Sequence, residues 1–274
     1  MALPATYTRG QRIWHWSLWG IVVAVLLFLV LPVLVIVPLS FSAGSFLTFP
    51  LPGLSLQWYQ ELFSSGPWQL SFRNSLVVAI ATTILASILG TLAAMGLNRA
   101  DFPAKSLVMA LLISPMVVPI VIVGVGVYFF YAPLGLTGSL LGLTLAHTVL
   151  AVPFVLITVS ATLAGFDHNL VRAAASLGAP PLLTFRRVVL PTIAPGVVSG
   201  AIFAFVTSFD EVVVALFLTG PGERTLPRQM LVGIRENISP VIAAAATLLI
   251  LLSVLLMATT EILRRRSARL HGRE

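Results

Sequence analysis

The sequence predicts an all-α membrane protein with six transmembrane helices. Of its 274 residues, 58% are hydrophobic and only 9% are charged, and the mean hydropathy is +1.03. Soluble domains carry about 25% charged residues, so this composition is typical of a protein that crosses a membrane several times. The chain has no cysteine, which excludes a disulfide framework and a thiolate metal site.

Six apolar stretches are long enough to cross a hydrocarbon core about 30 Å thick, which takes about 20 helical residues. They comprise residues 16–39, 76–97, 107–134, 140–163, 193–218 and 240–263. The first run is too long for the core of a cleaved signal peptide, so we expect it to span the membrane. Prolines interrupt several stretches, and Pro191 and Pro195 are expected to break the chain before the fifth.

The distribution of basic residues indicates the orientation. With the N-terminus in the cytoplasm, twelve of the sixteen Lys and Arg residues lie inside. The remaining four are Arg73, Arg224, Arg228 and Arg235. Cytoplasmic segments carry such an excess, so both termini are predicted to be cytoplasmic. The expected organisation is an N-terminal segment of residues 1–15, one transmembrane domain of residues 16–263, and a basic tail of residues 264–274.

The two longer outer loops differ in chemistry. Residues 40–68 contain aromatic residues and prolines but almost no charge, which fits a segment that lies along the membrane–water interface. Residues 220–239 carry Glu and Arg side chains. They form either a solvated loop or a contact surface for a soluble binding protein.

A polar island, residues 165–190, separates the fourth and fifth apolar stretches. Asp167 or Asn169 can cap a helix over residues 170–177, and Gly178 stands where a helix commonly ends in the left-handed conformation. The small alanine and serine side chains of this helix leave a smooth surface that fits a partner's groove. The alternative is an ordinary cytoplasmic connector with an alanine-rich helix.

Asp210 and Glu211 lie inside the fifth apolar stretch, close to Ser208. An ionised group at the centre of a membrane helix costs about 2.5–3.5 kcal/mol, so such residues usually face a cavity or a partner. On a continuous helix adjacent side chains point about 100° apart, so one acid would face a solute pathway while the other pairs with a neighbour such as Arg73. The pattern indicates either transient binding of a passing cation, with Ser208, Asp210 and Glu211 as the residues of the substrate pathway, or a structural ion pair between helices.

His147, in the fourth stretch, is either a hydrogen-bonded packing residue or part of a pathway lining. The sequence has no glycine-rich phosphate loop with Lys-Ser/Thr and no His-Glu-x-x-His motif. We therefore expect no catalytic, metal-binding or cofactor-binding residues on this chain, and ATP must be bound by another polypeptide.

In the polar island, Ala173-Ala174 is followed after three residues by Gly178, and later by Leu190-Pro191. This spacing resembles the cytoplasmic loop of importer-type ABC permeases, the MetI-like membrane subunits of binding-protein-dependent transporters. The resemblance implies a type I ABC importer permease fold, in which the loop forms a short coupling helix that docks into a cleft on an ATPase subunit. The coupling residues that it implies are Arg172, Ala173, Ala174, Ser176, Leu177, Gly178, Leu190 and Pro191. Arg172 stands where the family's signature usually has glutamate.

Further motifs are Ser208-Phe209-Asp210-Glu211, Thr225-Leu226-Pro227, Ser239-Pro240, Ala146-His147, Pro153-Phe154 and the segment from Pro115 to Pro119. Together they resemble the polyamine (spermidine/putrescine) branch of that family. The resemblance implies a bacterial inner-membrane permease for a polyamine or a related small organic cation, delivered by an extracytoplasmic solute-binding protein. It also implies a second homologous permease, in a heterodimer, and two ATPase subunits that bind ATP and Mg²⁺. Ile120 stands where some polyamine permeases carry an acid, which leaves 4-aminobutyrate and opine-type solutes open.

Two other classes of protein compete with this interpretation. A self-sufficient secondary transporter would use Asp210 and Glu211 as a proton relay and would not need the polar island. A membrane scaffold that transports nothing would leave the intramembrane acids without a purpose. Co-purification of an ATPase with this chain separates the three classes.

Overall fold

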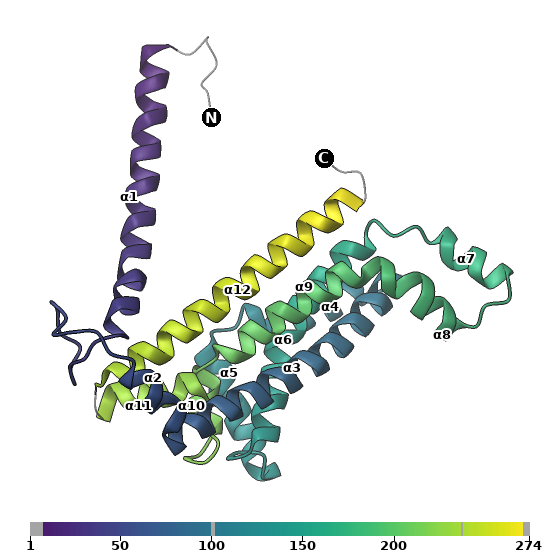
Figure 1. The fold of residues 1–274 in the computed structure, drawn as a ribbon. Coiled ribbons are helices and arrows are strands. Elements are labelled where there is room, and N and C mark those ends of the chain that lie inside the picture. Colours follow the sequence, from purple (N-terminus) through teal and green to yellow (C-terminus); the bar gives the residue numbers. More distant parts are fainter. Residues whose placement is uncertain (1–7, 100–101, 237, 271–274) are drawn as a thin grey trace.

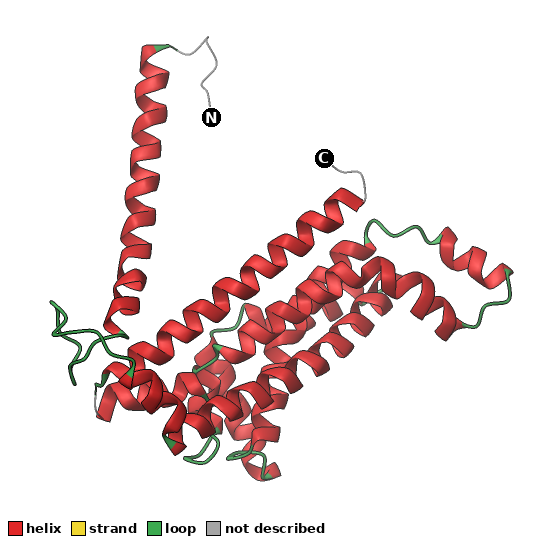
Figure 2. Cartoon of the chain, in the orientation of Figure 1, coloured by secondary structure: helices red, strands yellow, loops and turns green. Residues whose placement is uncertain are grey.

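The computed structural model describes residues 8–99, 102–236 and 238–270, and this part of the chain contains helices and no β-strand (Figure 2). Within it, five helical runs are long and apolar enough to cross a membrane. They are α1 (Arg9–Leu39), α3 (Gly66–Arg99), α6 (Leu140–Leu163), the run Pro181–Phe209, which ends with α9 (Leu190–Phe209), and α12 (Pro240–Leu270). The predicted all-α, multi-pass fold is confirmed.

The third predicted span is a bent pair of helices. The helix axis bends by 101° between the run that contains α4 (Lys105–Ile113) and the run that contains α5 (Ile120–Tyr131). Pro115 and Pro119 lie at the bend, where each lacks the N–H that a continuous helix needs. Counted as one crossing, the pair brings the number of candidate spans to six, in agreement with the prediction.

The central bundle consists of α3, α6 and α9 (Figure 1). Glycines bring these helices close together. A Cβ atom at Gly90 would lie 2.7 Å from Cβ of Val155, and one at Gly200 would lie 2.5 Å from Oγ1 of Thr158. Larger side chains at these positions would force the helices apart, so the small residues set the interhelical distance.

Pro191 and Pro195 do not break the chain, contrary to the prediction. α8 (Pro181–Thr184), a π-helical turn (Phe185–Val189) and α9 follow one another without interruption. Pro191 lies in the first turn of α9, directly after the π turn. Proline has no N–H to donate to the preceding turn, and the wider π turn before it lets the helix continue without that hydrogen bond.

The two ends of the bundle carry different elements (Figure 1). The C-terminal end of α12 lies at the same end as α7 (Asn169–Ser176) and α8, whereas α2 (Gln57–Ser64), α10 (Val213–Leu218) and α11 (Leu226–Glu236) lie at the opposite end. α11 occupies a segment that was expected to be a loop. The polar island and the end of α12 share one side, as the predicted topology requires; the cytoplasmic identity of that side stays a prediction.

The first and last long helices extend beyond the predicted transmembrane domain, whose boundaries stay a prediction. Residues 9–15, expected as an N-terminal segment, already belong to α1, and residues 264–270 of the basic tail extend α12. Residues 1–7 and 271–274 lie outside the described residues. α1 stands apart from the central bundle, and none of its residues is buried within this chain.

Candidate functional site

The polar island contains the short helix α7. Oδ1 of Asp167 accepts a hydrogen bond from the backbone N–H two residues later, at 2.9 Å, and so holds the start of the helix. At the other end, Gly178 has φ +78°, the left-handed conformation predicted for it. The Gly178 N–H donates to the Ala175 carbonyl at 2.9 Å, and the Ala179 N–H donates to the Ala174 carbonyl at 3.0 Å. This pair of bonds is the Schellman arrangement, which ends a helix through the backbone alone.

Val171 of α7 packs against its own chain, whereas most of the helix is exposed. Val171 and Ala175, one turn apart, line a cavity of about 220 Å³ together with side chains from the end of α3 and from the π turn. Arg172, Ala173 and Leu177 are exposed, and Leu177 reaches an exposed fraction of 88%. A fully exposed leucine at the tip of a polar helix fits a surface that a partner covers.

The predicted coupling residues fall into two groups. Arg172, Ala173, Ala174, Ser176, Leu177 and Gly178 belong to α7 or to its C-terminal turn. Leu190 and Pro191 instead begin α9, where Leu190 packs against the core of the central bundle and Pro191 is exposed. The first group can offer side chains to a partner, whereas Leu190 connects the island to the bundle.

The fifth membrane-spanning run does not continue as a helix through Asp210, contrary to the prediction. α9 ends at Phe209, and α10 begins at Val213. The Glu211 carboxylate accepts hydrogen bonds from the first three backbone N–H groups of α10, at 2.8–3.2 Å. These donors have no partner within the helix and are partly or fully buried in the protein, so the carboxylate stabilises the new helix start.

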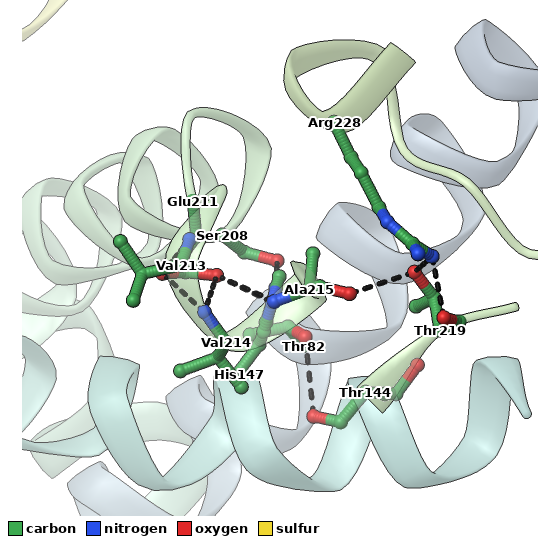
Figure 3. Close-up of polar contacts among 10 residues, drawn as sticks. All are labelled: Thr82, Thr144, His147, Ser208, Glu211, Val213, Val214, Ala215, Thr219 and Arg228. Carbon is green, nitrogen blue, oxygen red and sulfur yellow. Dashed lines mark hydrogen bonds and ion pairs between the residues drawn. The ribbon is translucent and has the colours of Figure 1, made fainter. Parts of the chain in front are cut away.

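His147 of α6 contacts both sides of this break (Figure 3). Its Nδ1 lies 2.9 Å from Oγ of Ser208, in the last turn of α9, and its Nε2 lies 3.4 Å from Oε2 of Glu211. Both His147 and Glu211 are buried. The neighbour of the buried acid is therefore His147 and not Arg73, the residue named from the sequence. His147 itself is a hydrogen-bonded packing residue, one of the two roles considered for it.

Asp210 has different surroundings, because its side chain is exposed on this chain whereas that of Glu211 is buried. The two acids do face different environments, but the cause is the break in the helix and not a 100° rotation along a continuous one. In the part of the chain that the structure describes, no group of three or more His, Asp or Glu side chains is placed to hold a metal ion.

The far end of α10 is held from α11 and α3. Nη1 of Arg228 donates to the backbone and hydroxyl oxygens of Thr219, and to the Gly220 carbonyl at 2.9 Å (Figure 3). Nδ2 of Asn74 donates to the Arg224 carbonyl at 3.1 Å. Burial, and then the neighbouring Arg224, lower the pKa of the Arg228 guanidinium, which still keeps its proton at neutral pH. Sequence reasoning missed Asn74 and the contact of Arg228, although an Asn at the edge of an apolar stretch is a usable signal.

Residues 86–269 match the family model described as "Binding-protein-dependent transport system inner membrane component". The chain belongs to this family. The matched residues include the polar island and the break at Asp210, so both regions are parts of the permease domain and not additions to it.

Several curated relatives of this permease cover most of its length. The "Spermidine/putrescine transport system permease protein PotC" of Escherichia coli (strain K12) is 29% identical over 225 residues, which is 82% of this chain and 85% of PotC. The "Putrescine transport system permease protein PotI" of the same strain is 33% identical over 237 residues, 83% of this chain and 84% of PotI. The predicted relation to the importer permeases is therefore confirmed, and the chain is a transport subunit and not an enzyme.

Solved structures of ABC importers share the permease fold. A bacterial ABC transporter involved in the import of the acidic polysaccharide alginate gives a TM-score of 0.74 at 14% identity, covering 93% of this chain and 98% of that one. The MetNI methionine ABC transporter, in an inward-facing conformation, gives 0.53 at 19% identity, covering 74% and 99%. At these identities the likeness establishes the fold alone.

Proposed function

We propose that this permease is a membrane-spanning subunit of an ATP-driven importer that takes up a polyamine or a related small organic cation from an extracytoplasmic solute-binding protein. The observation that carries the choice of solute is the likeness to PotC and PotI over more than four fifths of the chain. The exposed carboxylate of Asp210, directly after the helical run Pro181–Phe209, supports it because an anionic group at the end of a membrane-spanning run attracts a cation.

The partners follow from the same proposal. A second homologous permease completes the pathway as a heterodimer, and two ATPase subunits bind ATP and Mg²⁺ in the cytoplasm of a bacterium whose inner membrane holds the complex. Leu177 and the other exposed side chains of α7 dock into a cleft on one ATPase subunit. Closure of the ATPase dimer then moves α7 and switches the spans between inward-facing and outward-facing states.

The proposed solute pathway passes the segment from Ser208 to Glu211. Asp210 is the exposed member of this segment, while Ser208 and Glu211 contact His147. A carboxylate in the outer part of the run lowers the energy of an ammonium group that leaves water, and a single acid limits how tightly the solute is held.

The test uses the assembled transporter, with its ATPase and its second permease, in proteoliposomes. Replacing Asp210 with Asn removes the charge but keeps the volume, and initial uptake of putrescine at low concentration is expected to fall by at least about tenfold. The matched control is Glu61→Gln, which removes an exposed acid of α2 and should leave uptake unchanged.

Three results contradict parts of the proposal. Uptake by the Asp210→Asn transporter at the parental rate removes Asp210 from the pathway. Uptake of 4-aminobutyrate in preference to putrescine rejects the polyamine and leaves the importer in place. Uptake by the isolated chain, driven by a proton gradient without an ATPase, favours a secondary transporter instead.

A further inference from the structure

We propose that Glu211 and His147 are positioning residues, which direct the Asp210 carboxylate into the solute pathway without touching the solute themselves. This inference rests on the pathway role proposed above for Asp210. It gives different tasks to two adjacent acids. From the sequence alone, both are candidates for solute contact.

The contacts of Glu211 leave its carboxylate no free oxygen for a solute. Oε1 accepts from the N–H groups of Val213 and Val214, and Oε2 accepts from those of Val214 and Ala215. Oε2 also lies 3.4 Å from the imidazole of His147. With only 6% of its surface exposed, Glu211 is enclosed by these partners. Its charge acts on the start of α10 and not on the pathway.

His147 holds the two helices on either side of Asp210 together. Asp210 lies between Ser208, which contacts Nδ1 of His147, and Glu211, which faces Nε2. Nδ1 of His147 shares a hydrogen bond with the Ser208 hydroxyl, whereas Nε2 faces the Glu211 carboxylate at 3.4 Å without forming a hydrogen bond. We call the contacts of His147 with Ser208 and Glu211 the clamp. His147 comes from α6 in the central bundle and is 1% exposed, so the clamp is anchored in the core of the protein.

The far end of α10 is held as well, by Arg228 on the carbonyls of Thr219 and Gly220. α10 has only six residues and cannot be stable by itself. A negative side chain at its start and a positive one at its end both complement the helix dipole. With both ends of α10 held, we infer that the backbone of the break is constrained and that its neighbours set the direction of the Asp210 side chain.

A single cysteine substitution tests this directly, because the chain contains no cysteine of its own. Asp210→Cys in the assembled transporter introduces a single thiol on this chain, and its reaction with a small cationic methanethiosulfonate is followed without any solute. We expect the thiol to react readily, and its rate to fall at least about tenfold when Glu211→Gln or His147→Ala is added, since the rate depends on access. Glu236→Gln serves as the matched background, and His147→Gln, which can still donate and accept, should restore part of the rate.

Transport kinetics give a second readout. Glu211→Gln and His147→Ala should each lower the maximal uptake rate by the same factor for putrescine and for spermidine, and the double variant should be no worse than the more affected single one. Direct contact between Glu211 and the solute predicts instead a raised KM, more so for spermidine, which carries the larger charge.

The outcomes separate this inference from the proposed function. Equal labelling rates at residue 210 in all backgrounds, in transporters that still assemble with the ATPase, overturn the positioning roles and leave the pathway role of Asp210 intact. A thiol at residue 210 that never reacts overturns both proposals, since the clamp then presents nothing to the pathway. Labelling that responds as expected while putrescine is not taken up retains the clamp and rejects the polyamine.

Discussion

The short helices α7 and α10 each follow a break in helical structure, yet their ends are stabilised in different ways. α7 ends through backbone hydrogen bonds around Gly178, and its exposed face carries side chains that nothing on this chain covers. α10 begins at the buried carboxylate of Glu211, and its far end is bound by the side chain of Arg228. A carboxylate holds the start of each helix, but only α10 also has a charged side chain bound at its far end, while most side chains of α7 are exposed.

The difference follows from the solvent around each helix. Water satisfies the backbone groups at the end of an exposed helix, so a glycine in the left-handed conformation is enough to end α7. Groups buried in the protein must find every partner within it, and ionised side chains make the strongest hydrogen bonds. Changes in α7 should therefore affect docking more than stability, and changes around α10 should affect stability first.

The largest expected effect on stability comes from Glu211→Ala. It leaves three N–H groups of α10, two of them buried, without their acceptor and removes the carboxylate that faces His147. We expect the free energy of unfolding to fall by about 3–5 kcal/mol. Thermal unfolding of the detergent-purified complex measures this, with Glu236→Ala as the control for loss of an exposed acid. A melting temperature equal to that of the parent would show that the carboxylate does not hold α10.

Gly178→Val is expected to have an intermediate and local effect. The left-handed conformation at φ +78° costs about 1–2 kcal/mol for a residue with a side chain, so the end of α7 should open more often. Hydrogen exchange of the α7 amides should speed up by about tenfold, and uptake should fall with it. Gly165→Val is the matched control, because a Cβ atom at either glycine meets open space and only Gly178 of the two has a positive φ. Equal exchange rates in both variants contradict this explanation.

The smallest effect on stability is expected for Leu177→Ala. Its side chain is 88% exposed, so the free energy of unfolding should change by no more than about 0.5 kcal/mol. Docking onto an ATPase would bury this side chain, and its loss should weaken the binding of the ATPase subunit by about tenfold. Co-purification at graded concentrations measures the binding, with Leu182→Ala, an exposed leucine of α8, as the control. Equal losses in both variants place the docking surface elsewhere.

Much of the molecule was predictable from its sequence. Apolar length predicted the spans, and α6 has the predicted bounds because Ser139 caps its start and the polar island follows its end. Gly178 was predictable because the left-handed end of a helix is a local property of a few residues. The family, too, could be assigned from motif spacing in the polar island.

Only the tertiary structure decided how the fifth run is built. That α9 stops at Phe209, that Glu211 turns inward and that Asp210 stays exposed all depend on His147, 64 residues earlier than Glu211 along the chain, and on Arg228 in another helix. Apolar stretches specify a span whether or not it is continuous, since membrane insertion depends on summed hydrophobicity. A break inside a span depends instead on which distant side chains arrive to satisfy the freed backbone groups, and no local pattern contains that information.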